Sequence, residues 1–190
     1  KQDYPTLAVF GGSQGAQFLN DWVAHLVKNP PAVCGQVFLC TGTTAWEKFL
    51  SSVSGPDINA ESWIWEHKKF RIIAQPYVYD MPQLLSQCQA FVARAGASSL
   101  AEMAAMGLPG VVVPYPFAMD RHQDANAGAY AAAGGVMVLA QAGLSPEALW
   151  QAVQRVWLDE DNRRRMGKAM GRMAPVKAVG DMMDWVRRLR

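Results

Sequence analysis

The stretch FVARAGASSLAEMAAMGLPGVVVPYPFAMDRHQDANA, residues 91–127, decides the fold class of this chain. Two apolar runs, at 90–93 and 110–114, are rich in β-branched and aromatic residues and read as buried strands. A helical pattern at 99–106 separates them. Strands that alternate with helices form βαβ units, in which each strand runs into a turn and then a helix. The sequence therefore predicts a parallel sheet with polar turns at the carboxyl ends of its strands.

The same alternation extends over the rest of the chain. Further strands are predicted at 6–10, 36–41, 70–74 and 136–139. Further helices are predicted at 16–28, 44–53, 80–88, 122–133 and 145–157, with two more after Asp161, and 54–68 reads as a loop or irregular insert. No internal repeat or linker divides the chain. The expected fold is one α/β domain over residues 1–190, a Rossmann-like doubly wound parallel sheet of about six strands.

Composition limits the class of protein. A chain of 190 residues with 51% hydrophobic and 18% charged residues is long and apolar enough to form a packed core, which excludes disorder. No apolar run approaches the roughly 20 residues that span a bilayer, and the opening KQDYPTLAVFGG lacks the apolar stretch of a signal peptide. We therefore expect a cytoplasmic protein.

The three cysteines form no CxxC pair, which argues against a disulfide framework and against a zinc site. Ten of the 18 Lys and Arg residues lie after residue 150, among five acids. This asymmetry favours a solvated helical face, and the alternative is a surface for anionic lipid.

The turn after the first strand reads Gly11-Gly12-Ser13-Gln14-Gly15-Ala16 and opens an amphipathic helix. Glycines let the backbone approach a ligand, and the free N–H groups at a helix start attract phosphate. The turn is neither GxGxxG nor a Walker A loop, and no acid ends the second strand, so nicotinamide binding is disfavoured. A tight turn without a ligand remains the alternative.

The second turn is Arg94-Ala95-Gly96-Ala97-Ser98-Ser99, again between a strand and a helix. With the first turn it would offer several N–H donors to a pyrophosphate. Glu102 follows three residues later. Ser99-x-x-Glu102 matches a capping box, in which the glutamate serves only the helix start. The alternative is that this carboxylate accepts both hydroxyls of a ribose.

A third polar segment, Asp120-Arg121-His122-Gln123 with Asn126, follows the strand at 110–114. Short polar side chains at this place suit recognition of sugar hydroxyls, although a polar helix start would look the same. His122 has no carboxylate or cysteine at ligand spacing, so a metal site is not expected. A GxSxG elbow is absent from the sequence, so a catalytic triad is unsupported.

In this order, GGSQGA, RAGASSLAE, AAMGLPGVVVPYP and DRHQDANA resemble the carboxyl-terminal half of the MurG family of UDP-N-acetylglucosamine transferases. The resemblance covers nearly the whole chain from Leu7 onward. It implies one half of a GT-B architecture, in which two Rossmann-like domains face each other across a cleft and the carboxyl-terminal one binds the sugar nucleotide. The acceptor domain, with the catalytic base, has no counterpart in this chain, so no catalytic residue is expected here.

The resemblance also implies roles for individual residues. Glu102 would hold the ribose hydroxyls, the backbone of Val78 would read the uracil edge, and Tyr77 would pack on the base. His122 stands where the family commonly carries a glutamine near the sugar. The full set of donor-binding residues implied in this way is Gly12, Ser13, Gln14, Gly15, Tyr77, Val78, Arg94, Gly96, Ala97, Ser98, Ser99, Glu102, Asp120, Arg121, His122, Gln123 and Asn126.

The expected function is to bind UDP-N-acetylglucosamine as the donor half of an inverting transferase that converts lipid I to lipid II in peptidoglycan synthesis. Expected partners are the UDP-sugar, an amino-terminal acceptor domain or chain and, through it, a lipid-linked acceptor, but no nucleic acid. No cofactor or metal is expected, and the full enzyme would lie on the inner face of the plasma membrane. The alternatives are a sugar-nucleotide epimerase domain, the donor subunit of another split GT-B transferase, and an inactive nucleotide-sugar-binding module.

Overall fold

The computed structural model describes residues 4–12, 15–53, 57–58 and 61–174, and for Asp57, Ile58 and Asp120 it describes the backbone alone. The strands are β1 (Thr6–Phe10), β2 (Gly35–Cys40), β3 (Asp57–Ile58), β4 (Trp63–His67), β5 (Phe70–Gln75), β6 (Ala90–Ala93), β7 (Gly110–Val112) and β8 (Val136–Val138). The helices are α1 (Gln17–Lys28), α2 (Trp46–Ser52), α3 (Met81–Leu85), α4 (Ala97–Ala105), α5 (His122–Ala132), α6 (Pro146–Trp157) and α7 (Glu160–Arg172). Two short 3-10 turns, η1 (Thr43–Ala45) and η2 (Met119–Arg121), precede α2 and α5.

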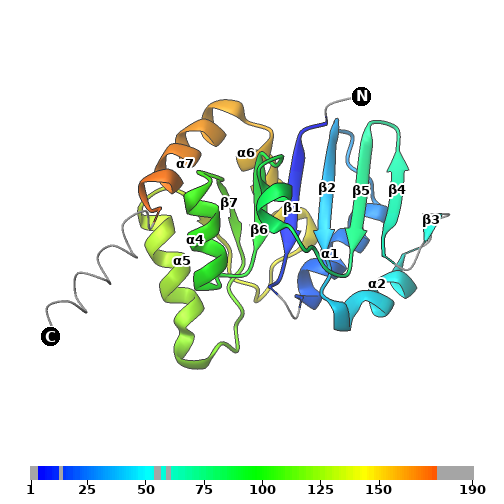
Figure 1. Cartoon of the computed structure of the whole chain (residues 1–190), viewed down its shortest axis with the longest axis horizontal. Helices are drawn as coiled ribbons and strands as arrows, with labels where there is room; N and C mark the ends of the chain where they lie inside the picture. Colours follow the sequence, from blue (N-terminus) through cyan, green and yellow to red (C-terminus); the bar gives the residue numbers. More distant parts are fainter. Residues whose placement is uncertain (1–3, 13–14, 54–56, 59–60, 175–190) are drawn as a thin grey trace, which may run out of the picture.

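All strands belong to one sheet in the order β3-β4-β5-β2-β1-β6-β7-β8 (Figure 1). Six neighbouring strands of this sheet, in the order β5-β2-β1-β6-β7-β8, pair in parallel. They are the six strands that the sequence predicts. Their order is that of a doubly wound Rossmann sheet. The chain leaves β1 in one direction to β2 and later returns on the other side to β6, so the order of strands reverses between β1 and β6.

The prediction of a loop or irregular insert at 54–68 is wrong where this segment forms the strands β3 and β4. β4 pairs antiparallel with β5, from Trp63 opposite Ala74 to His67 opposite Phe70, and β3 pairs antiparallel with β4. Trp63 is fully buried, whereas Glu66 and His67 are exposed. A strand with one end in the core and the other in solvent has no clear period-2 pattern, which is why the sequence does not reveal it.

Helices cover both faces of the sheet because successive side chains of a strand point to opposite faces. Leu7 and Val9 of β1 face a core built with α1, α2 and α6. Ala8 and Phe10 face a second core, to which α3, α4 and α5 contribute. The two cores are therefore separated by the sheet and share it as a wall.

Helix α7 starts at Glu160, close to the predicted position, with the Asp159 side chain accepting from the Asn162 amide. It contributes Met166 to one core and Met170 to the other, and Figure 1 shows it beside α4 and α5 at the β7 side of the sheet. The second helix predicted after Asp161 falls on 175–190, outside the described residues.

A close contact between β2 and α6 provides a test of this packing. A Cβ atom added at Gly35 would lie against the ring of Trp157, with Cζ2 at 2.9 Å, and this ring is fully buried. We predict that Gly35→Ala lowers the free energy of unfolding by about 1–3 kcal/mol, because the core must shift to admit the methyl group.

The matched control is Gly128→Ala on the exposed face of α5, where an added Cβ meets nothing within 4 Å. Its stability should rise by up to about 1 kcal/mol, since alanine is the better helix former. Urea unfolding of both variants makes the comparison, and equal stability of Gly35→Ala and the parent would contradict the packing described.

Candidate functional site

Two cavities open at the carboxyl ends of the parallel strands, where the strand order reverses. The first, about 190 Å³, is called the Glu102 cavity and is lined by Phe10, Gly12, Cys40, Tyr77, Val78, Met81, Ser99 and Glu102. The second, about 500 Å³, is called the Arg94 cavity and is lined by Gly11, Gly15, Ala16, Gln17, Phe18, Arg94, Tyr115, Gln123 and Gln141. In doubly wound sheets this is the place where ligands bind.

The turn after β1 contributes to both cavities, because Gly12 lines the first and Gly15 lines the second. Both glycines have positive φ, 83° and 75°, and the Gly15 amide donates to the Gly12 carbonyl at 2.9 Å. A Cβ at Gly15 would strike the carbonyl oxygen of Thr41. Only glycine fits there, so the turn passes directly against the end of β2. Ser13 and Gln14 lie outside the described residues.

The start of α4 differs from the prediction. The helix begins at Ala97, with Gly96 as N-cap and without a side-chain cap, so Ser99 is its third residue. A capping box needs Ser99 at the N-cap, and that interpretation of Ser99-x-x-Glu102 is therefore wrong. The first amides of α4, those of Ala97, Ser98 and Ser99, have no acceptor within the helix. They form the positive end of the helix dipole beside the Glu102 cavity.

Glu102 is exposed to solvent and lines its cavity. Among the described residues its carboxylate has no hydrogen bond or ion pair. Tyr77 and Val78 come from the loop after β5 and line the same cavity, and Tyr77 is 47% exposed with its ring edge against Tyr79. The cavity thus combines an apolar wall with one available carboxylate.

Arg94, at the end of β6, is buried in the wall of the second cavity. Its guanidinium donates to the carbonyl oxygens of Val113 at 3.0 Å and Pro114 at 3.1 Å, and to Gln141 Oε1 at 2.7 Å. It also lies over the rings of Phe18 and Tyr115, 5.9 and 5.4 Å from their centroids.

Burial lowers the pKa of Arg94, an effect that the Tyr115 phenol partly opposes. Arginine nevertheless stays protonated in proteins because its ordinary pKa lies far above neutral pH. The hydrogen-bond partners just described are neutral oxygens, so they orient the guanidinium without cancelling its charge. An anion in the Arg94 cavity would be attracted by that charge.

The predicted segment from Asp120 to Asn126 is split by the structure. Gln123 lines the Arg94 cavity, and its Oε1 accepts from the amides of Tyr115 at 2.9 Å and Ala95 at 3.2 Å. Asn126 donates to the Ala95 carbonyl at 3.0 Å and so holds the turn after β6. It lines neither cavity.

Arg121 and His122 are exposed and also line neither cavity. Arg121 has φ 51° and pairs with Asp124 at 2.8 Å. His122 Nδ1 donates to the Met119 carbonyl at 2.7 Å. The backbone of Asp120 lies in η2, and nothing is described of its side chain.

Several lining residues are missed by the sequence reasoning. Phe10 and Cys40 are the last residues of β1 and β2, and Gln141 lies three residues after β8. A search of every strand end, rather than of polar clusters alone, would find them. Burial raises the pKa of the Cys40 thiol, so it forms part of the apolar wall.

The part of the chain that the structure describes contains no group of three His, Cys, Asp or Glu residues placed to hold a metal ion. None of its helices is long and apolar enough to cross a membrane.

Comparison with known proteins gives consistent results. Residues 6–180 match the glycosyltransferase family 28 C-terminal domain. Two relatives, from Desulforamulus reducens and Desulfotalea psychrophila, are 31% and 35% identical to this chain. Both are named UDP-N-acetylglucosamine--N-acetylmuramyl-(pentapeptide) pyrophosphoryl-undecaprenol N-acetylglucosamine transferase. These alignments cover 100% and 97% of this chain but only 50% and 47% of the relatives.

The crystal structure of Acinetobacter baumannii MurG superposes with a TM-score of 0.81 and 26% identity, over 99% of this chain and 53% of that one. The chain thus spans about half the length of the relatives it matches, and the resemblance to the MurG family and the GT-B fold class are confirmed. The chain belongs to the glycosyltransferase family 28 C-terminal domain family.

Proposed function

We propose that this chain binds UDP-N-acetylglucosamine as the donor half of an inverting glycosyltransferase of the MurG type. The observation that carries the proposal is the pair of cavities at the strand-order reversal, one with a free carboxylate and one with a buried cation. The relatives that match the whole chain are N-acetylglucosamine transferases, and their names state a pyrophosphoryl-undecaprenol acceptor.

The Glu102 cavity suits the uridine. Its wall of Phe10, Val78 and Met81 is apolar, and Tyr77 offers an aromatic face to a base. A ribose diol presents two hydroxyl donors, and a carboxylate without another partner accepts both. We assign this role to Glu102, and the exclusion of the capping box removes the competing role for this side chain.

The pyrophosphate of the donor would lie between the two cavities. Gly12 lines one cavity and Gly15 the other, so the turn after β1 connects them. The free amides at the start of α4 adjoin the same place through Ser99. A pyrophosphate joins a nucleoside to a sugar, which matches this arrangement, and helix N-termini bind such groups well. Ser13 and Gln14 belong to the same turn and are assigned here by family resemblance.

The Arg94 cavity would receive the sugar side of the donor. The Nε2 group of Gln123 has no acceptor among the described residues and is available to a hydroxyl, and Gln141, which accepts from Arg94, lines the same cavity. Asp120, Arg121 and His122 retain a proposed role near the sugar from the family resemblance alone. Asn126 is proposed to act indirectly, by holding Ala95.

In the proposed reaction an acceptor hydroxyl attacks the anomeric carbon, the bond from that carbon to the pyrophosphate oxygen breaks, and UDP leaves. The chain stabilises the charge on the departing pyrophosphate with N–H groups already in place, each worth about 3–4 kcal/mol in comparable anion holes. The base that takes the proton would belong to the acceptor half. Neither a metal nor a cofactor is required by this proposal.

The proposed partners are an amino-terminal acceptor domain or chain and, through it, a lipid-linked acceptor, with no role for nucleic acid. The relatives extend over about twice the length of this chain, which leaves room for such a domain. A membrane-embedded acceptor implies that the whole enzyme works in the cytoplasm at the inner face of the plasma membrane.

The donor site can be tested at Glu102. Glu102→Gln keeps the size of the side chain but removes the charge that strengthens two hydrogen bonds, each contributing about 1.5–3 kcal/mol. We predict that UDP affinity, measured by calorimetry, falls tenfold or more while the melting temperature stays unchanged. Glu102→Ala should weaken UDP binding further without loss of stability, because Glu102 does not cap α4.

Glu47→Gln on the exposed start of α2 is the matched control, since it removes a carboxylate that lines neither cavity. Its UDP affinity should equal that of the parent. Unchanged affinity in both Glu102 variants would remove this residue from the site.

The proposal that donor binding and the catalytic base belong to different halves of the enzyme gives a second test. We predict that the 190-residue chain, mixed with UDP-N-acetylglucosamine and a lipid I analogue, releases no UDP above background, because the base and acceptor site lie in the other half. The full-length Desulfotalea psychrophila relative serves as positive control in the same assay. Sustained turnover by this chain alone would refute the proposal that it is only the donor half.

A further inference from the structure

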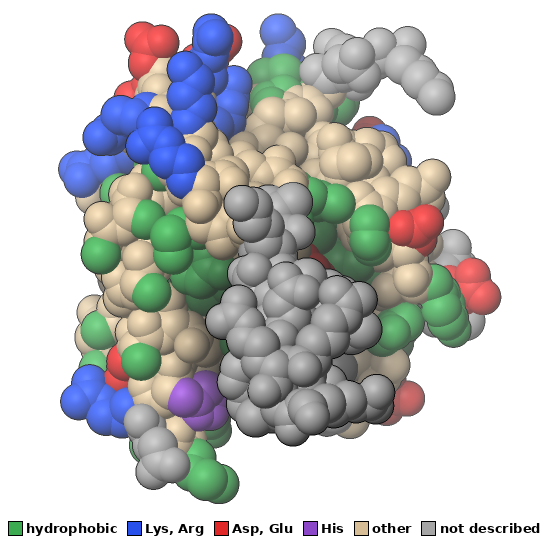
Figure 2. Space-filling model, turned by 60° about the vertical axis from the view of Figure 1, so that its left-hand side comes forward, with side chains coloured by type: hydrophobic (Ala, Val, Ile, Leu, Met, Phe, Trp, Pro, Cys, Tyr) green, Lys and Arg blue, Asp and Glu red, His purple; other side chains and the backbone are tan. Residues whose placement is uncertain are grey.

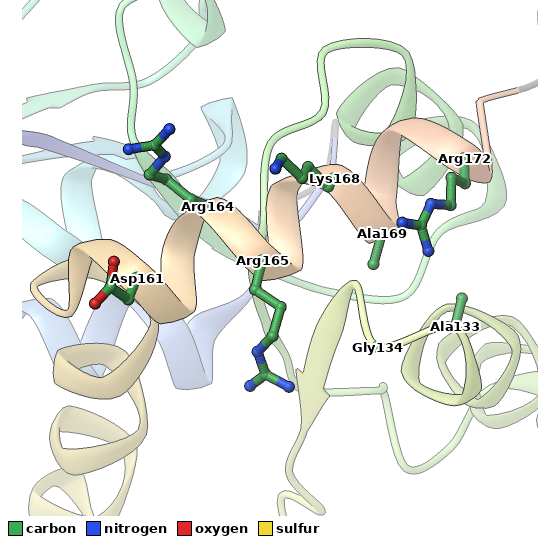
Figure 3. A pocket seen from close by; sticks show the side chains of 8 residues that line it. All are labelled: Ala133, Gly134, Asp161, Arg164, Arg165, Lys168, Ala169 and Arg172. Atoms are coloured by element: carbon green, nitrogen blue, oxygen red, sulfur yellow. The ribbon is translucent and has the colours of Figure 1, made fainter.

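A third hollow, between α7 and the turn that joins α5 to β8, is not explained by donor binding. It has a volume of about 430 Å³, and the cations that line it are Arg164, Arg165, Lys168 and Arg172 (Figure 3). Asp161 is the single carboxylate in the lining. Figure 2 shows blue Lys and Arg side chains gathered at the upper end of this face, where α7 lies in Figure 1. We call this feature the α7 hollow.

Among the described residues, the cations of the α7 hollow form no ion pair with a carboxylate. Arg165 donates to the Asn162 amide oxygen at 2.6 Å, a neutral group. Between residues 4 and 174, wherever side chains are described, no carboxylate lies within ion-pair distance of Arg164, Lys168 or Arg172. Four like charges on one helix face repel one another, so this arrangement costs stability unless an anion is present.

The helix dipole accounts for only part of the pattern. Acids in the first turn of α7 and Arg172 in its last turn are favourable placements. Arg164 and Arg165 lie in the middle of α7, where the dipole gives no benefit. The carboxyl end of α5 lies nearby, and three of its last carbonyls, those of Ala129, Tyr130 and Ala131, already accept from the amides of Ala133, Gly135 and Gly134.

The shape of the hollow also distinguishes it from an ordinary solvated helix face. Its second wall is the turn between α5 and β8, formed by Ala133 and Gly134. A Cβ at Gly134 would meet nothing within 4 Å, so open space remains in front of the backbone. In Figure 3, Arg165 and Arg172 extend on the side of this turn, and Arg164 and Lys168 on the other side. The hollow therefore has Arg165 and Arg172 beside this turn and the exposed Arg164 and Lys168 at its opposite rim.

The α7 hollow is also separate from the two donor cavities. Gly134 precedes β8 and so lies at the amino ends of the parallel strands, whereas both donor cavities lie at the carboxyl ends. A ligand in the hollow would leave the proposed donor site free.

We propose that the α7 hollow is a second anion site, which binds phosphate groups carrying more than one negative charge. Arginine presents a planar fork of donors that matches phosphate oxygens two at a time, and three of the four cations are arginines. The lining contains no aromatic side chain on which a nucleobase could stack, which disfavours a single-stranded nucleic acid. Such phosphate groups come from two sources, a soluble polyphosphate or the headgroups of a bilayer.

The soluble source is tested with inorganic pyrophosphate, followed through backbone amide resonances. Those of Gly134 and Lys168 report the hollow, and that of Gly15 reports the donor site. The variant replaces Arg164, Lys168 and Arg172 with Gln, and the matched control replaces Lys48, Lys68 and Lys69, which are exposed and line neither the hollow nor the donor cavities. Both variants lose three positive charges.

We expect pyrophosphate to shift Gly134 and Lys168 in the parent and in the control. In the hollow variant the affinity at Gly134 should fall at least tenfold while the response of Gly15 is unchanged, which separates this site from the donor site. Added salt should weaken binding at the hollow.

The bilayer source is tested by sedimentation with phosphatidylglycerol vesicles against phosphatidylcholine vesicles. Binding to the anionic vesicles that the hollow variant loses assigns the site to headgroups. Pyrophosphate binding without vesicle binding assigns it to a soluble anion. The proposal is overturned if neither ligand acts on Gly134 and Lys168, or if the control variant loses binding to the same extent.

Discussion

The buried guanidinium of Arg94, held by neutral oxygens, fixes the geometry of the sheet edge where the carboxyl ends of the parallel strands meet. Arg94 extends from the end of β6 to carbonyl oxygens at the end of β7 and to Gln141 beyond β8, and it lies over rings from α1 and from the loop after β7. Three neighbouring strands are thereby held at their carboxyl ends by one side chain. The Arg94 cavity exists in its present form because this side chain spans those strands.

The choice of neutral partners has a cost and a benefit. Removing a guanidinium from water is unfavourable, and burial accordingly lowers the pKa of Arg94. A carboxylate would offset more of that cost but would also neutralise the charge. Carbonyl and amide oxygens satisfy the N–H groups and leave the positive charge available to a ligand. This arrangement favours an anion-binding site over maximal stability, as preorganised sites generally do.

The sequence reveals the parallel core of the fold, because each of its six strands is a short apolar run followed by a turn and a helix. It does not reveal β4, whose residues from Trp63 to His67 pass from the core into solvent at the sheet edge. It misplaces the start of α4, since the Ser99-x-x-Glu102 spacing is satisfied in a helix interior as readily as at a cap. The helix start follows from where β6 ends: the strand stops at Ala93, and α4 begins at Ala97 after a turn of three residues.

The site shows the same division between local and long-range information. The turns after β1 and β6 can be predicted from the sequence, because the backbone conformation of each turn requires glycine or another small residue. Residues adjacent in sequence, such as His122 and Gln123, separate in space once the helix begins, and only Gln123 reaches a cavity. Gln141 enters the site through β8, which pairs with β7 from a distant part of the chain.

The position of β1 in the centre of the sheet has a consequence for synthesis of the chain. Leu7 pairs with Val37 on one side and with Ala90 on the other. A ribosome-bound chain can therefore form the first pair early, while the other edge of β1 stays open until β6 has emerged. Because pairing distant segments is the slow part of folding, closure of this edge is the step that completes the donor cavities. A nucleotide that contacts residues on both sides of the reversal binds only after that closure, and so acts as a selective stabiliser of the finished sheet.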